Sequence, residues 1–336
     1  MMAPSPDSKN RHVTIKDVAR EGGVSTQTVT RAINDMPGIN IHTKDRIRKL
    51  AEELGYTPSR FAKGLVQGAG TCVGMVVPEL TNSYFPAVVS SVVHHATRRG
   101  WQITLNESAS DPDTMMLAIE QIAPQVDAVI GWSGSGLATC QRVLGRRPLV
   151  LLDHPEYPGA AGEVSFDYVH AAQLTLSHLI SQGRTRISYL DSAPPLGLSV
   201  RAQAFARQAG EIGVPVTFLN AEGSAEGART AVSSLMETNL LPDALITFND
   251  VMAIGAMKAI AAAGKSVPRE CSVIGMDGIA IGELLTPELS TLSLDFNEVG
   301  ATTVQLVEDL LDGKISPGAM EAKRTLKHRM VYRQSS

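Results

Sequence analysis

The chain has 336 residues, which allows two or three domains, and its hydrophobic and charged fractions of 43% and 19% exclude a disordered chain. No run approaches the ~18 apolar residues that a membrane span requires, and the first ten residues lack the apolar core of a signal peptide. The net charge of -4 is unevenly spread: residues 1–68 carry a net +4 and the remainder a net -8, so a basic head that meets a polyanion is expected.

The first structured segment is predicted to be a pair of short helices. Thr14 is a suitable N-cap, and Asp17 occupies the third helical position, as in a capping box. Gly22-Gly23 would end this helix, and Ser25 is placed to cap a second one. Two short helices joined by a tight, glycine-containing turn predict a helix-turn-helix.

The exposed face of the second helix favours DNA binding. It would carry four polar side chains: Thr26, Gln27, Thr30 and Arg31. Gln and Arg can pair bidentately with adenine and guanine edges in the major groove. A third helix is expected over residues 42–54, with Asn40 as a possible cap and four side chains facing phosphates: Lys44, Arg46, Arg48 and Lys49. The alternative is a small structural helical domain with a solvated polar face.

The rest of the chain predicts an α/β body. Short apolar runs are expected as strands at residues 71–77, 102–105, 128–131, 149–152, 187–190, 216–219, 244–247 and 272–276. Amphipathic helices are expected between them at residues 85–99, 114–123, 171–182, 201–211, 225–238 and 251–263. This alternation is typical of parallel sheets covered on both faces, and its length favours two similar lobes over one sheet.

Several polar residues lie just beyond the predicted strands. Asp153, Asn249 and Asp277 follow three of them, and Arg201 opens a helix. Such groups suit a polyhydroxylated ligand at the carboxyl ends of the strands. Asp250 is expected instead to cap the helix that begins at residue 251. Four aromatic side chains offer apolar or stacking walls: Tyr84, Phe85, Trp132 and Phe166. For Trp132 and Phe166 the alternative is a place in the core or in a subunit interface.

Residues 14–19 and 23–34, continuing into 54–65, closely resemble the head of the LacI family, the lactose and purine repressor type. Residues 242–244, 249–255, 272–278 and 287–291 match the family's body, so the resemblance covers essentially the whole chain. It implies an all-α helix-turn-helix head over residues 12–57, a hinge helix over 58–68 and a periplasmic-binding-protein-like core over 69–336. The core would consist of two doubly wound parallel-sheet lobes.

The resemblance also implies roles for residues of the head and hinge. Thr26, Gln27 and Arg31 fall where the family reads bases. A second set falls where it holds phosphates or caps helices: Thr14, Ser25, Thr28, Asn34, Asn40 and Lys44. Ala62 and Leu65 lie in the hinge that meets the minor groove, where the leucine wedges between base steps.

In the body, the resemblance implies three crossings between the lobes, near residues 162–166, 292–296 and 320–325. Lobe 1 would hold about 69–164 and 295–322, and lobe 2 about 165–292 and 323–336. A helix over 297–312 would return to lobe 1, and a final strand over 324–332 would lie in lobe 2. The positions matching Arg201, Asn249 and Asp277 touch the effector in the family.

We therefore expect a cytoplasmic, homodimeric regulator, most simply a repressor, that binds a pseudo-palindromic operator and responds to a small molecule. A sugar or sugar acid is the first candidate effector and a nucleobase the second, as inducer or corepressor. No cofactor, metal or catalytic set is expected, and the three scattered cysteines suit a reducing compartment. The rivals are a sugar-binding protein without a DNA function and an α/β enzyme.

Overall fold

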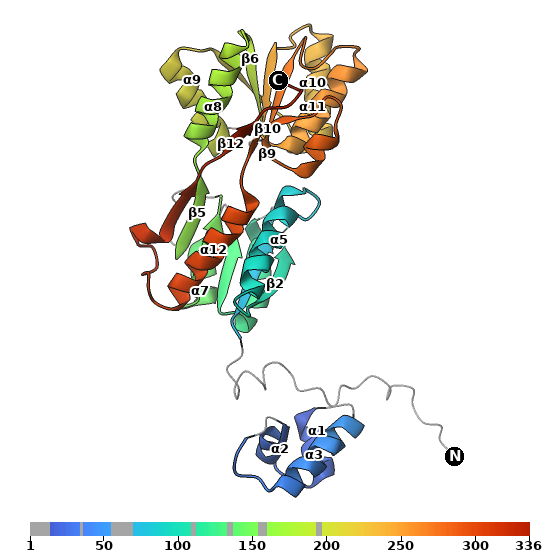
Figure 1. Ribbon diagram of the computed structural model, residues 1–336, viewed down its shortest axis with the longest axis vertical. Coiled ribbons are helices and arrows are strands. Elements are labelled where there is room, and N and C mark those ends of the chain that lie inside the picture. Colours follow the sequence, from blue (N-terminus) through green and yellow to red (C-terminus); the bar gives the residue numbers. More distant parts are fainter. Residues whose placement is uncertain are drawn as a thin grey trace, which may run out of the picture. The chain divides into compact units, whose positions relative to one another are not determined.

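The computed structural model describes residues 14–33, 36–54, 70–108, 112–132, 137–153, 160–192 and 197–336 (Figure 1). The chain divides into two compact units, a helical head that ends before Cys72 and a body from Cys72 to Ser336. Among the described residues, no helix is both long and apolar enough to cross a membrane.

The head consists of three helices: α1 (Ile15–Gly22), α2 (Thr26–Ile33) and α3 (Ile41–Glu53). Each contributes apolar side chains to one small core, including Val18, Val29 and Ile47, which are fully buried. The predicted helix pair and third helix are confirmed to within a residue or two of their ends. The predicted hinge, residues 58–68, lies outside the described residues.

Lobe 1 of the body is built on a six-stranded parallel sheet with the order β11-β5-β4-β3-β1-β2. Its strands are β1 (Cys72–Val77), β2 (Gln102–Glu107), β3 (Ala128–Gly131), β4 (Leu149–Leu152), β5 (Gly162–Phe166) and β11 (Lys323–Leu326). Its helices are α5 (Tyr84–Thr97), α6 (Pro112–Ile122), α7 (Leu137–Leu144) and α12 (Phe296–Leu311). The central strands β3 and β4 are buried along their whole length, and β1 from Val73 on, because helices cover both faces of the sheet.

Lobe 2 repeats this plan with a six-stranded sheet of order β12-β10-β9-β8-β6-β7. Its strands are β6 (Ile187–Asp191), β7 (Val216–Asn220), β8 (Ala244–Thr247), β9 (Ser272–Asp277), β10 (Ser290–Ser293) and β12 (Arg329–Val331). Its helices are α8 (Tyr168–Ser181), α9 (Val200–Ile212), α10 (Ala225–Glu237) and α11 (Asp250–Ala262). Only β12 runs antiparallel to its neighbour among the described strand pairs.

Two helix pairs approach each other closely because glycine removes a side chain from the contact. In lobe 1, α5 and α12 lie side by side (Figure 1). A Cβ on Gly300 of α12 would stand 2.7 Å from the Ser91 backbone of α5. In lobe 2, a Cβ on Gly255 of α11 would stand 2.0 Å from the Ala225 carbonyl oxygen. Any larger residue at either position would push the helices apart.

All eight predicted strands are present, but three segments differ from expectation. The sequence pattern did not predict α7 as a helix or β5 as a strand. The single final strand expected over residues 324–332 is wrong, because that stretch forms β11 in lobe 1 and β12 in lobe 2. Residues 323–326, and Phe166 at the end of β5, therefore belong to the sheet of lobe 1, not to lobe 2 as expected. The chain crosses between the lobes three times, as predicted, but the third crossing falls at residues 327–328, beyond the predicted 320–325.

Candidate functional site

In the head, Gly23 makes the turn that a helix-turn-helix requires. Its φ of 63° lies in the left-handed region, and its N–H bonds back to carbonyls of α1. Ser25 then begins the second helix, since its hydroxyl accepts the Thr28 N–H at 3.1 Å. The turn and cap direct the first residues of α2, Thr26 and Gln27, outward, and both are exposed. Arg31 lies one turn further along and is half-buried.

The predicted caps of the other two helices are also confirmed. The Thr14 hydroxyl and N–H both donate to Asp17, at 2.7 and 2.9 Å, and these two bonds hold the pKa of Asp17 at about 2. The Asn40 side chain accepts the His42 N–H at 2.9 Å. Thr14 and Asn40 therefore fix the helix ends through hydrogen bonds within the head.

Among the predicted phosphate contacts, Arg48 has a different position. It is half-buried, and its Nε donates to the Ala32 carbonyl at 2.9 Å, so it ties α3 to the end of α2. Lys44 is also half-buried. Thr28 lies in α2 and is half-buried, and three further predicted DNA contacts lie outside the described residues: Asn34, Ala62 and Leu65.

The body brings four polar side chains together between the lobes, which we name the interlobe cluster: Asp153, Tyr168, Arg201 and Asp277. Arg201 is buried, and its Nη2 donates to Asp153 of lobe 1 at 2.9 Å. Its Nη1 donates to Asp277 of lobe 2 at 3.2 Å. The Tyr168 hydroxyl donates to the other oxygen of Asp153 in a close contact. One guanidinium therefore joins carboxylates from both lobes.

Both carboxylates of the cluster have unusual backbones. Asp153 has a φ of 57° and Asp277 a φ of 124°, values that residues with a Cβ rarely adopt. Such strain persists only where the surroundings enforce it, and it is often found at ligand sites. Each aspartate ends a central strand, at the edge of the sheet where α/β folds bind ligands.

The electrostatics of the cluster follow from burial. Burial raises the pKa of Asp277 well above its usual value, against the attraction of Arg201. Burial also disfavours the charge on Arg201, but Tyr168 and the two aspartates raise its pKa in net. Its guanidinium also lies over the Phe248 ring, 4.5 Å from the centroid. The permanent charge of Arg201 therefore faces both carboxylates, and for Asp277 it only partly offsets the effect of burial on the pKa.

The cap of α11 is Asn249, not Asp250 as expected. Asn249 caps α11, since its Oδ1 accepts the Met252 N–H at 2.8 Å. Asp250 is fully buried and does not cap the helix, so that expectation is wrong. Its Oδ2 accepts the N–H groups of Gly278 and Ile279, at 2.9 and 2.8 Å. Asp250 therefore fixes the turn that directly follows Asp277.

The predicted aromatic residues also lie at the carboxyl end of lobe 1. Tyr84, Phe85 and Trp132 pack edge to face, with ring centroids 5.1 and 5.5 Å apart. The Tyr84 hydroxyl and the Trp132 N–H are buried and have no hydrogen-bond partner among the described residues. Phe166 is buried and packs against His328 at 5.9 Å, which is a core contact at the third crossing.

Sequence reasoning missed three residues at this site: Tyr168, Asp250 and His328. Burial lowers the pKa of His328 to about 3, so it packs against Tyr168 as a neutral ring. No pattern marks Tyr168, which is one apolar residue among many in α8. The sequence does mark Asp250, because a carboxylate at the start of a helix is a typical cap. In the structure, however, the preceding residue, Asn249, caps α11.

Comparisons with known proteins agree with this architecture. Residues 14–59 match the model for bacterial regulatory proteins of the lacI family, and residues 176–336 match a periplasmic binding protein-like domain. The chain is 27% identical to catabolite control protein A of Priestia megaterium, over 97% of this chain and 99% of that protein. It is 28% identical to the HTH-type transcriptional repressor PurR of Vibrio vulnificus, over 90% and 92%.

Solved structures extend the comparison to the fold. A LacI family transcriptional regulator from Arthrobacter sp. FB24 is 44% identical, with a TM-score of 0.76 over 80% of this chain and 99% of that one. The same protein has been solved in complex with lactose. The lac repressor dimer bound to operator matches with a TM-score of 0.78 over 97% of this chain and 99% of that one. At 23% identity, that match supports the fold alone.

Proposed function

The chain belongs to the LacI family and is a DNA-binding transcriptional regulator, not an enzyme, and from this premise we propose that it is a homodimeric repressor controlled by a sugar-like effector. Two copies of the head would read the half-sites of a pseudo-palindromic operator, since a twofold dimer suits twofold DNA. In this proposal, residues 58–68 are the hinge between head and body, and the protein works in the bacterial cytoplasm where its DNA lies.

On the DNA side, the proposal rests on the exposed start of α2. Thr26 and Gln27 project from a helix whose turn and cap are fixed by Gly23 and Ser25. Gln27 would contact a base edge, and Arg31 a second base or a neighbouring phosphate. The head's net positive charge would supply the sequence-independent part of the affinity.

On the effector side, one observation carries the proposal: Arg201 joins Asp153 of lobe 1 to Asp277 of lobe 2. A ligand with vicinal hydroxyls can donate to both carboxylates and accept from the guanidinium, which replaces this direct bridge. The side-chain amide nitrogen of Asn249 has no partner among the described residues and is a further donor. The lactose complex of the 44% identical relative favours a sugar over a nucleobase.

Replacement of the bridge would couple the effector to DNA. Asp153 and Asp277 belong to different lobes, so a ligand inserted between them changes the angle between the lobes. We expect that change to move the two hinge segments of a dimer. By linkage, an effector that weakens operator binding must itself bind the DNA complex more weakly by the same factor.

The test is a thermal-shift screen of the full chain with lactose, other sugars, sugar acids and purines. A ligand at about 100 times its Kd stabilises its target by about 2.7 kcal/mol, a clear rise in melting temperature. Asp277→Asn should abolish the shift. Asp312→Asn, which changes an exposed carboxylate just beyond α12, should keep it. A shift that survives in Asp277→Asn would contradict the proposed site, and purines as the only ligands would refute the sugar class.

A further inference from the structure

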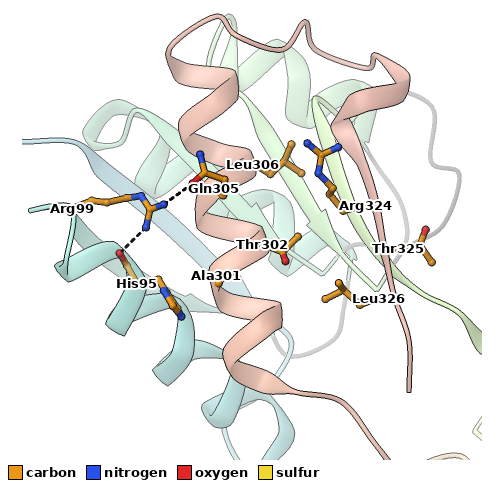
Figure 2. Close-up of a pocket in the computed structure, with 9 residues that line it drawn as sticks. All are labelled: His95, Arg99, Ala301, Thr302, Gln305, Leu306, Arg324, Thr325 and Leu326. Atoms are coloured by element: carbon orange, nitrogen blue, oxygen red, sulfur yellow. Dashed lines mark hydrogen bonds between the residues drawn. The ribbon is translucent and has the colours of Figure 1, made fainter. Parts of the chain in front are cut away.

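A groove of about 470 Å³ lies on the outer face of α12 in lobe 1, and none of its lining residues belongs to the interlobe cluster. Figure 2 shows its construction: the end of α5 forms one wall, α12 forms the floor and β11 forms the other wall. Three segments far apart in the sequence therefore meet at one surface. The volume suits a small metabolite, since ligand pockets usually measure about 300–1,000 Å³.

The charge of the groove is positive. Arg99, Arg324 and His95 line it, and no carboxylate is among the lining residues. The Arg99 charge is compensated, because its Nε donates to Glu308 at 3.1 Å just outside the groove. Its Nη2 donates to Gln305 at 2.8 Å, so the guanidinium is held in a fixed orientation (Figure 2).

Arg324 is the uncompensated cation of the groove. It is half-buried, and its guanidinium bonds only to the Glu321 carbonyl oxygen within the described part of the chain. No carboxylate of those residues lies within 4.0 Å of it. Most of the five N–H donors of Arg324 therefore have no acceptor among the residues that the structure describes. A half-buried guanidinium in this state favours an anionic oxygen acceptor.

The two segments that form the walls of the groove are basic on an otherwise acidic body. Residues 94–99 and 323–329 contain no Asp or Glu, although the chain beyond residue 68 has a net charge of -8. Together they carry six permanent cations: Arg98, Arg99, Lys323, Arg324, Lys327 and Arg329. Four of the six lie in the walls of the groove or next to them, because Arg98 and Arg99 follow α5 and Lys323 and Arg324 belong to β11, whereas Arg329 belongs to β12 of lobe 2.

We propose that this groove is a second ligand site, distinct from the interlobe cluster, and that it binds the phosphomonoester of a small polyol. The phosphate would accept from the Arg324 guanidinium, whose planar fork can contact two of its terminal oxygens. The Thr302 hydroxyl has no partner among the described residues and would bond a ligand hydroxyl. Leu306 and Leu326 would contact the carbon skeleton.

The site is tested by calorimetric titration of the full chain with ribose 5-phosphate, ribose and inorganic phosphate. Ribose 5-phosphate should bind at millimolar concentration or below, ribose should not, and inorganic phosphate should compete. Arg324→Gln should weaken binding by roughly tenfold or more, and Arg324→Lys by less, because lysine keeps the charge but loses the fork. Thr302→Val should weaken ribose 5-phosphate but leave inorganic phosphate unchanged.

Two control variants separate this site from its alternatives. Arg98→Gln removes an exposed arginine next to the groove that does not line it, and it should leave the affinity within about twofold. Asp277→Asn should have no effect, although it removes the effector response proposed above. Equal losses in Arg324→Gln and Arg98→Gln would mean diffuse attraction and overturn the proposal. Loss in Asp277→Asn alone, or no binding of either phosphate, would overturn it as well.

Discussion

Asp250 allows a sharp prediction about stability, because its carboxylate is buried and its three hydrogen bonds divide cleanly between two oxygens. Oδ2 accepts both backbone N–H groups, from Gly278 and Ile279, and Oδ1 accepts only from the Thr291 hydroxyl, at 2.6 Å. In Asp250→Asn, the amide oxygen can keep both N–H bonds while the amide nitrogen donates to the Thr291 hydroxyl. The variant should therefore fold with the same contacts and without a titrating group.

The magnitude follows from the pKa of Asp250, which burial raises from 3.8 to about 6 against the effect of its hydrogen bonds. The folded state binds this proton more tightly than the unfolded state, so its stabilising contribution is complete below pH 3.8. That contribution is lost as the pH rises through 6. The full difference is about 3 kcal/mol of unfolding free energy, of which about 2 kcal/mol falls between pH 4.5 and 7.5.

The assay is urea unfolding of the wild type and Asp250→Asn at pH 4.5 and 7.5, followed by circular dichroism. Relative to the wild type, Asp250→Asn should gain about 2 kcal/mol of stability across this range. Asp250→Ala is the structural control, and it should lose about 1–3 kcal/mol for each backbone N–H left without an acceptor. Parallel pH profiles for the wild type and Asp250→Asn would refute the reasoning.

Three further predictions concern the interlobe cluster and the head. Arg201→Met leaves Asp277 buried without its cation, so the free energy of unfolding should fall by about 3–5 kcal/mol at pH 7. Urea unfolding measures this change, and a fall of less than about 1 kcal/mol would contradict the bridge. Gln27→Ala should weaken operator binding by about 1–3 kcal/mol in fluorescence anisotropy and relax the preference at one base pair, whereas a uniform loss over all sequences would indicate a phosphate contact. Asn40→Ala removes the cap of α3 and should destabilise the head by about 1 kcal/mol, whereas Asn40→Ser should retain most of the wild-type stability. Equal melting temperatures for the wild type and both variants would show that the cap contributes nothing.

The fold was largely predictable because its signals are local. Continuous apolar runs such as residues 72–77 are typical of strands buried on both faces, and their alternation with amphipathic helices indicates parallel sheets. The failure at residues 324–332 has a physical cause. The stretch contains no glycine or proline, so no turn signal in the sequence marks the crossing at residues 327–328 between two sheets.

At the candidate sites, residues were predictable where position along a strand determines their role. Asp153 and Asp277 follow central strands, and the fold brings both to Arg201. The role of Asp250 depends on a turn 28 residues away, which no local pattern reveals. The groove over α12 was not predicted for the same reason, since α5, α12 and β11 meet only through tertiary packing.

The central claim is that effector binding at the interlobe cluster and operator binding by the head are energetically coupled. The most direct measurement is operator affinity by fluorescence anisotropy with and without the sugar that the thermal-shift screen identifies. A matching titration measures affinity for that sugar with and without saturating operator. The account predicts that both affinities change by the same factor, roughly 5- to 150-fold, and that Asp277→Asn removes the effect. Sugar affinity that is identical with and without operator would contradict it.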